Sequence, residues 1–311
     1  MADLSVKIAS LTLTSPVLLA SGTAGFGTEL EGLLDLSKIG GVCTKGISVK
    51  PRAGNASPRI CETPAGLINA IGLENPGIDG VLTKKIPAFP ARPLALIPNI
   101  FGTRVEEYAE LAKRLDAVAR VDALEVNISC PNVKEGGMPF GNDPKGAASV
   151  TRAVRAATRK PIIVKLSPNA VDVAAVGKAV EEEGADAVSV INTIVAMSID
   201  IQTRRPRIAN VTGGLSGPAI RPIAVRMVFE CNRRLKIPII GIGGIMTAED
   251  AIEFLIAGAS CVQVGTASFA NPGAAARVTQ GIEQYLNEKK IQSVRELVGT
   301  LDLPPGIVGD W

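Results

Sequence analysis

The sequence has no histidine among its 311 residues. Histidine is the only side chain whose unperturbed pKa puts its charge change near neutral pH, so any proton transfer there must use another residue type. A thiol, with an ordinary pKa of ~8.5, is the natural substitute. The chemistry of this chain, if it moves protons, is therefore expected to depend on a cysteine.

Aromatic residues make up only 3% of the chain, which argues against stacking platforms for nucleic-acid bases. Lysine and arginine total 33 against 30 acidic residues, and the net charge of +3 makes no case for a nucleic acid or an anionic membrane as partner. No segment approaches ~20 uncharged apolar residues, so we expect no membrane-spanning helix. The opening MADLSVKIAS carries charge without a sustained apolar run, which does not resemble a signal peptide.

The cysteines are few, odd in number and widely spaced, and no C-x-x-C pair occurs. This pattern predicts reduced thiols in a cytoplasmic protein, without the ligand spacing of an iron–sulfur cluster or a structural zinc site. They are Cys43, Cys61, Cys130, Cys231 and Cys261.

Short apolar runs alternate with helical patterns along the whole chain. Eight runs predict strands, at 16–20, 41–44, 94–99, 122–127, 161–166, 186–191, 237–241 and 260–264. Apolar residues at helical spacing predict helices over 105–119, 171–184 and 247–258, the last opening with a Thr-x-x-Asp capping pattern. This alternation predicts an α/β fold, a (β/α)8 TIM barrel formed by residues 1–311 as a single domain. The alternative, an open doubly wound sheet, lacks its phosphate fingerprint.

The segments 4–8 and 11–13 look like a small N-terminal β-hairpin that closes the bottom of the barrel. Three connections are long, namely 46–93, 128–147 and 192–236. In a barrel, long insertions after strands are expected on the catalytic face.

Polar residues or glycines follow or end all eight predicted strands, and that edge is where barrel enzymes bind ligands. They are Ser21, Thr44, Lys45, Gly46, Asn99, Asn127, Lys165, Asn192, Thr193, Gly243, Gly244, Gly265 and Thr266.

Two of these strand ends, GIGGI at 241–245 and VGTAS at 264–268, have the glycines of a phosphate cradle, although tight turns alone would use the same residues. Lys165, within PIIVKLSPN, is costly in an apolar run unless it meets an anion. The N1/C2=O edge of a flavin would suit it. The alternative is a lysine that reaches the barrel mouth. Lys45 could meet a substrate carboxylate as well as the cofactor.

The candidate catalytic residue is Cys130, which lies in NISCPNVKEGG directly after a predicted strand. Its alternative role is that of a small buried hydrophobe. The loop at 133–144 then resembles a lid, in which Met138 and Phe140 could cover a substrate. Asn69 and Asn75, in NAIGLENPG, could read a ring with alternating donors and acceptors, although turn formation explains them equally well.

Nine motifs in order carry a resemblance to a known family: SGTAGFG, TKGIS, NAIGLENPG, NISCPNVKEGG, VKLSPN, INT, TRRPRIANVTGGLSGPAI, GIGGI and VQVGTASF. The chain resembles the catalytic subunit of class 1B, NAD-linked dihydroorotate dehydrogenases. The resemblance implies FMN, oxidation of (S)-dihydroorotate to orotate in pyrimidine (UMP) biosynthesis, and Cys130 as the base with Lys165 stabilising the reduced flavin. It implies FMN binding by Ser21, Lys45, Gly46, Asn99, Asn127, Lys165, Ile191, Gly217, Gly243, Gly244, Gly265 and Thr266. It implies substrate binding by Lys45, Asn69, Ala70, Ile71, Gly72, Leu73, Asn127, Asn192 and Thr193.

The resemblance also implies a partner subunit that carries FAD and a [2Fe-2S] cluster and reduces NAD, in a cytoplasmic heterotetramer built on a homodimer of catalytic chains. No metal site is expected in this chain. Glu74 stands where the family has glutamine, so we expect its charge to point away from the ligand, and Ala196 replaces a glycine.

Other readings remain open at the level of sequence. One is the class 1A enzyme, a homodimer that uses fumarate, and another is a dihydropyrimidine dehydrogenase-type domain acting on an uncharged ring. A flavin-free barrel lyase or isomerase for a sugar phosphate is a third. A non-catalytic partner subunit is a fourth, although it would not need Cys130 and both lysines.

Overall fold

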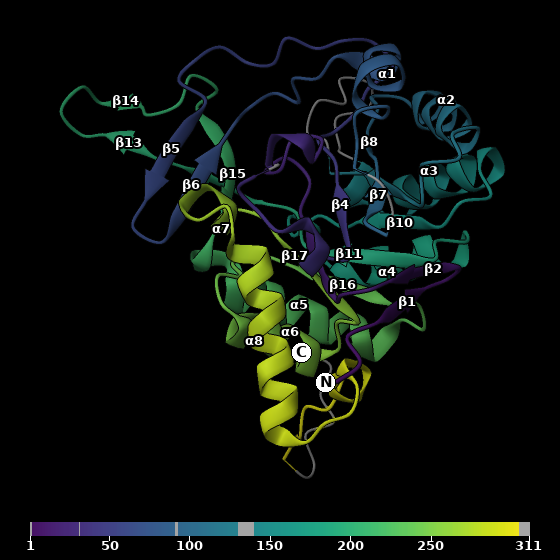
Figure 1. Cartoon of the computed structure of the whole chain (residues 1–311). Helices are drawn as coiled ribbons and strands as arrows, with labels where there is room; N and C mark the ends of the chain where they lie inside the picture. The colour runs from purple at the N-terminus through teal and green to yellow at the C-terminus, as the bar shows by residue number, and fades with distance from the viewer. Residues whose placement is uncertain (1, 31, 91–92, 130–139, 305–311) are drawn as a thin grey trace.

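The computed structural model describes residues 2–30, 32–90, 93–129 and 140–304. A parallel sheet closes into a barrel with helices on the outside (Figure 1). Its strands are β3 (Val17–Leu19), β4 (Gly41–Cys43), β7 (Ala95–Ile97), β8 (Asn99–Ile100), β9 (Leu124–Asn127), β10 (Ile162–Lys165), β11 (Ala187–Val190), β16 (Ile239–Ile242) and β17 (Cys261–Val264).

Strands β7 and β8 are two parts of one barrel strand, separated at Pro98, which has no N–H to donate to a ladder. Strand β7 pairs with β4 and β8 pairs with β9, so the broken strand closes the barrel. The eight predicted strands are thereby confirmed, and with them the (β/α)8 fold.

The helices that cover the barrel are amphipathic and bury one face against it. The three predicted helices are confirmed as α2 (Val105–Asp116), α4 (Val173–Glu182) and α6 (Ala248–Ala257). At the start of α6, Thr247 accepts from the N–H of Asp250 and the Asp250 carboxylate accepts from the N–H of Thr247, which completes the expected capping box. The remaining long helices are α3 (Pro144–Ala157), α5 (Arg221–Arg234) and α8 (Ala274–Lys289). Across the described ranges, none of the helices is both long and apolar enough to cross a lipid bilayer.

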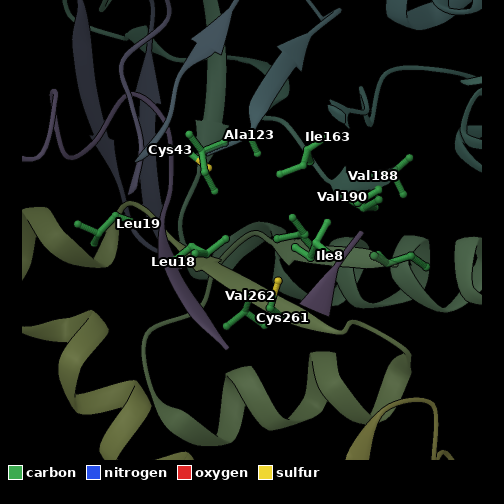
Figure 2. Packing of buried hydrophobic residues seen from close by; sticks show 14 of the residues in the cluster. Ile8, Leu18, Leu19, Cys43, Ala123, Ile163, Val188, Val190, Cys261 and Val262 are labelled. Atoms are coloured by element: carbon green, nitrogen blue, oxygen red, sulfur yellow. The ribbon is translucent and has the colours of Figure 1, made fainter. Parts of the chain in front are cut away.

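The predicted N-terminal hairpin consists of β1 (Val6–Ile8) and β2 (Leu11–Leu13), paired antiparallel with Ile8 opposite Leu11. Ile8 is fully buried and lies in the same cluster of side chains as Leu18, Ile163 and Cys261 of the barrel strands (Figure 2). The hairpin therefore closes one end of the barrel, as predicted.

Residues paired across parallel strands point to the same side, so the register identifies the inward-facing side chains. They form layers of four, each layer drawn from alternate strands. The layer nearest the hairpin contains small residues: Gly41, Ala123, Ala187 and Cys261. The next layer is aliphatic: Leu18, Ile97, Ile163 and Ile240.

A second sheet, which sequence reasoning did not predict, is formed from two of the long connections. Strands β12 (Ile194–Met197), β15 (Thr212–Ser216), β6 (Gly66–Asn69) and β5 (Ile60–Thr63) pair antiparallel in that order. A small hairpin, β13 (Ile199–Asp200) with β14 (Arg205–Pro206), extends farther from the barrel (Figure 1). Because β12 begins two residues after Asn192, this sheet stands at the carboxyl end of the barrel strands, where the long connections were expected.

Candidate functional site

Lys165, at the carboxyl end of β10, is buried inside the barrel rather than extended to solvent. Its ammonium donates to the hydroxyl of Ser21 at 3.1 Å. The same Nζ atom lies 3.9 Å from Oε1 of Glu125 on β9. The anion that this lysine was predicted to need is thus supplied, at least in part, by the chain itself.

Three asparagines lie near the same strand ends as the lysine. Asn127 lies directly beside Lys165 in the β9–β10 register, and Asn192 donates to Oδ1 of Asn127 at 3.3 Å. Asn99, fully buried on β8, donates from Nδ2 to Glu125 Oε1 at 2.7 Å. Amides and an ammonium from neighbouring strands therefore lie at the same end of the barrel.

Gly46 lies against this cluster, since a Cβ atom there would stand 3.2 Å from Oδ1 of Asn99 and 3.0 Å from the ring of Phe101. Ile191, directly after β11, is also buried, and its N–H donates to the carbonyl of Ile242. Both predicted cofactor residues thus border the barrel mouth.

The predicted phosphate cradle is assembled from three loops. Gly243 and Gly244 follow β16 with φ angles of +133° and +72°, and Gly217 follows β15 with a φ of +95°. A Cβ atom on Gly244 would lie 2.8 Å from the carbonyl oxygen of Gly217, so only glycine allows these loops to approach so closely. After β17, Thr266 donates to the hydroxyl of Ser216 at 2.8 Å, which draws the third loop, with Gly265, to the same place.

The predicted substrate residues Asn69 and Thr193 meet through Gly214. A Cβ atom on Gly214 would stand 2.1 Å from the Thr193 hydroxyl, so the threonine side chain occupies the space that this glycine leaves open. Asn69 is paired with Gly214 across β6 and β15 and donates to its carbonyl at 3.2 Å. Asn69 and Thr193 therefore lie on the same side of the second sheet, and the loop from Ala70 to Leu73 continues directly from Asn69.

Glu74 has a charged partner in its own long connection, because its carboxylate forms an ion pair with Arg59. The hydrogen bond from Arg59, with the nearby charge of Lys45, holds the pKa of Glu74 below its ordinary value. The expectation that Glu74 directs its charge away from a ligand agrees with this pairing. The proximity of Lys45 places that ammonium near the loop that follows Asn69.

Two side chains of the long loops, Asn75 and Phe140, have partners within the protein. Asn75 is buried and its amide is used within its own loop, accepting from the N–H groups of Ser48 and Gly77 and donating to the carbonyl of Leu73. Turn formation, the alternative explanation, therefore accounts for Asn75. Phe140 packs edge-to-face on Tyr108 of α2, with ring centroids 6.2 Å apart. Most of the loop expected to form a lid, residues 133–139, lies outside the described residues. Cys130 and Met138 lie outside the described residues.

Sequence reasoning missed a polar layer inside the barrel, immediately below Lys165 and Asn99. The polar layer consists of Cys43, Glu125, Ser189 and Gln263, one residue from each of four alternate strands. The signal was present, because a glutamate within DALEV and a glutamine within SCVQV are unusual in strands buried on both faces.

Burial, together with the neighbouring Glu125, raises the pKa of the Cys43 thiol well above its ordinary value. This thiol therefore stays protonated. The free cysteines Cys231 and Cys261 are also buried, and burial raises the pKa of each to about 12. None of these three thiols suits a base near neutral pH.

The donor set fits a phosphorylated, ring-bearing cofactor such as FMN. The glycine loops present backbone to a phosphate, and the ammonium and amide groups present donors to a polar ring edge. The fold and the site together define a (β/α)8 barrel whose strand ends carry the features of a phosphorylated-cofactor site.

Comparisons with known proteins identify the family. The sequence profile described as "Dihydroorotate dehydrogenase" matches residues 3–286. The "Dihydroorotate dehydrogenase B (NAD(+)), catalytic subunit" of Trichlorobacter lovleyi is 58% identical over 299 residues, covering 96% of this chain and 98% of that protein. The protein of the same name from Geobacter sulfurreducens is 56% identical over 301 residues, covering 97% and 99%.

A solved structure agrees at the level of fold. The crystal structure of the dihydroorotate dehydrogenase of Eimeria tenella in complex with ferulenol superposes with a TM-score of 0.80 at 26% identity, covering 96% of this chain and 88% of that one. The chain belongs to the dihydroorotate dehydrogenase family and is an oxidoreductase.

Proposed function

We propose that this chain oxidises (S)-dihydroorotate to orotate in pyrimidine biosynthesis, as an FMN-dependent NAD-linked catalytic subunit. The observation that carries the proposal is the meeting of Lys165, three asparagines and the glycine cradle at one barrel mouth. Bound FMN supplies the acceptor for the hydride that leaves the substrate. The reading as a flavin-free sugar-phosphate enzyme does not explain why a buried ammonium and amides surround the ring end of the site.

The FMN phosphate would be held by backbone of the three glycine loops, which approach one another too closely for any Cβ atom at Gly244. The ring edge would meet Lys165, Asn99 and Ser21, whose polar atoms are already fixed by contacts within the protein. The full proposed set is Ser21, Lys45, Gly46, Asn99, Asn127, Lys165, Ile191, Gly217, Gly243, Gly244, Gly265 and Thr266.

The substrate would lie between the barrel mouth and the second sheet. Lys45 supplies a positive charge for its carboxylate, while Asn127 and Asn192, joined by a hydrogen bond of 3.3 Å, present amides to the ring. Thr193 and Asn69 close the side formed by the second sheet. Ala70, Ile71, Gly72 and Leu73 complete the proposed substrate-binding residues.

Cys130 is the proposed base. It follows β9 by three residues, and it would remove the proton from C5 of the substrate while hydride leaves C6. The thiolate is the reactive form of cysteine, so the fraction of active protein should increase toward alkaline pH.

Electrons would leave through a partner subunit that carries FAD and a [2Fe-2S] cluster and reduces NAD. The names of the relatives, each a catalytic subunit of an NAD(+) enzyme, support this over the fumarate-linked class 1A reading. We place the whole chain as one domain within a cytoplasmic heterotetramer.

The homodimer at the centre of that assembly would use the exposed apolar residues of the second sheet and of the hairpin that extends from it. Val195 and Met197 on β12, Ile199 on β13 and Ile201 in the turn that follows are 62%, 46%, 51% and 78% exposed, and they form an apolar row along the chain. Val195 and Met197 alternate along β12, so these two share a face of the second sheet. Ile60 on β5 adds to the same sheet. An apolar row of this kind is typical of a surface that a protein partner covers.

The electron acceptor provides the test. The chain is first reduced with dihydroorotate without oxygen and then mixed with fumarate, or with the electron-transfer subunit and NAD. We expect NADH only in the second mixture and no reoxidation by fumarate. Reoxidation by fumarate would instead assign the chain to class 1A, and a colourless protein that takes up no added FMN would favour the sugar-phosphate reading.

A further inference from the structure

Glu125 is a carboxylate with no exposed surface, located inside a barrel layer where branched apolar residues usually predominate. It belongs to the polar layer, and the four strands that build this layer alternate around the barrel. The layer lies between an aliphatic layer toward the hairpin and the Lys165 and Asn99 side chains toward the mouth. Its position is thus directly below the proposed cofactor site.

Each oxygen of Glu125 has specific partners. Oε1 accepts from Asn99 Nδ2 at 2.7 Å and lies 3.9 Å from Lys165 Nζ. Oε2 accepts from the hydroxyl of Ser189 at 3.0 Å and from Gln263 Nε2 at 2.8 Å. One oxygen therefore faces the two residues proposed to meet the FMN ring, and the other is anchored in the polar layer.

The carboxylate is held in its charged form. Burial alone would raise the pKa of Glu125, but the Lys165 ammonium and the hydrogen bonds from Gln263, Asn99 and Ser189 outweigh burial and lower it. A negative charge is thus fixed 3.9 Å from the ammonium of Lys165, which is the only buried lysine in the described barrel strands.

Stability gained over an apolar layer does not account for this arrangement. Replacing a buried ion pair by well-packed apolar residues is often neutral or stabilising. The polar layer also has a cost, because in the described parts of the chain Gln263 Oε1 is buried without a hydrogen-bond partner. An unsatisfied buried acceptor costs about 1–3 kcal/mol. The polar layer is better explained by its effect on Lys165 and Asn99, which lie on its side toward the barrel mouth.

We propose that Glu125 is a positioning residue, which fixes the Lys165 ammonium and the Asn99 amide at the FMN ring and offsets part of the lysine's charge, thereby lowering the reduction potential of bound FMN. The inference rests on the proposed function, since it requires FMN at this site.

The direction follows from electrostatics. Reduction places negative charge on the flavin ring, and a positive charge beside it makes reduction more favourable. Glu125 opposes this effect from a distance of 3.9 Å to the ammonium, in a water-poor interior where charges interact strongly. Removing the carboxylate charge should therefore raise the potential.

The experiment measures the midpoint potential of FMN in the holoprotein by anaerobic dye titration. We expect Glu125→Gln to shift the potential upward and Glu125→Asp, which keeps the charge, to stay closer to the wild type. The matched control is Ser189→Ala, which removes one donor to Glu125 but leaves both charges, and its potential should be unchanged. An unchanged or lower potential in Glu125→Gln would overturn the proposal, as would an equal upward shift in Ser189→Ala.

A second measurement tests the pairing even if the Glu125→Gln variant fails to fold. If Lys165 and Glu125 act as a pair, Lys165→Met should leave the carboxyl protonated at neutral pH. The infrared spectrum of that variant should then gain a carboxylic-acid C=O band that the wild type lacks. Absence of the band would overturn the pairing. Failure of the wild-type chain to take up FMN would contradict the proposed function instead. Failure of the proposed function and failure of the Glu125 proposal are therefore distinguishable.

Discussion

At the scale of single residues, the main polar feature of the barrel interior is the buried ion pair between Lys165 and Glu125. Lys165 and Glu125 are almost completely buried, and each is also hydrogen-bonded, to Ser21 in one case and to three polar side chains in the other. Removing one member of such a pair leaves an uncompensated charge, which typically costs about 3–5 kcal/mol. The pair can therefore be examined through stability as well as through chemistry.

The difference in free energy of unfolding between the wild type and Glu125→Gln, called the stability gap below, should depend on pH. The pKa of Glu125 is lower in the folded chain than its ordinary value of 4.5, so the carboxylate stabilises the fold above that value. This contribution is lost as the pH falls from there through the folded-state pKa. Urea unfolding at neutral pH and at about pH 4 should show a gap that shrinks in acid. A gap that grows in acid would contradict the assignment, and the exposed Glu110→Gln serves as the control.

Cys130→Ala should lose most turnover and keep FMN, because the proposed base is removed while the proposed FMN-binding residues remain. Turnover and flavin content measured on the same preparation check this. Cys231→Ala is the matched control: burial raises the pKa of that thiol to about 12, so the variant should keep the alkaline rise in rate. Turnover of Cys130→Ala near the wild-type rate would show that another group is the base.

The sequence predicted Lys165 as a residue that needs an anion, but it could not identify the partner. Glu125, Ser189 and Gln263 are far apart in sequence, and only the barrel register brings them to one layer. Likewise, the contact of Thr193 with Gly214 depends on the pairing of β12 and β15. Strand ends can be read from local patterns, whereas partners across a barrel cannot.

At the scale of elements, the carboxyl ends of β15, β16 and β17 act together because glycine loops allow them to touch. Gly244 has a φ of +72° and its position for a Cβ atom is occupied by the Gly217 carbonyl and Arg221. Local signals identified these loops well, since a glycine pair after a strand is visible in sequence. The second sheet was missed because its strands, such as β5 and β15, are short and are interrupted by glycine and charge.

Gly244→Ala should weaken FMN binding about tenfold or more, since a strained backbone position of this kind costs about 1–3 kcal/mol and displaces the cradle. The dissociation constant of FMN, measured by fluorescence of released flavin, checks the change. Gly273→Ala is the matched control, because its φ is −79° and a Cβ atom there would meet nothing closer than 3.5 Å. Equal FMN affinity in both variants would show that the glycine loops do not hold the phosphate.

At the scale of the whole molecule, the eight-fold alternation of strand and helix was readable from composition and period, because every barrel strand is buried on both faces. What could not be read was the second sheet, and with it the exposed apolar row on its surface. A monomer would leave that apolar row exposed to solvent.

Ile199→Asp should shift the chain from dimer to monomer, because it places a charge in the middle of the apolar row. Sedimentation velocity of the purified protein measures the change. Val171→Asp, at a fully exposed valine that precedes α4, is the control and should leave the assembly intact. A dimer that persists in Ile199→Asp would move the interface to another surface.

The most direct test of the account is anaerobic addition of dihydroorotate to the purified chain while the visible spectrum is recorded. We expect a yellow protein whose flavin band bleaches, because hydride passes from substrate to bound FMN. A yellow protein that stays oxidised would contradict dihydroorotate as the substrate of this chain, and a protein that remains colourless after FMN is added would contradict the flavin site itself.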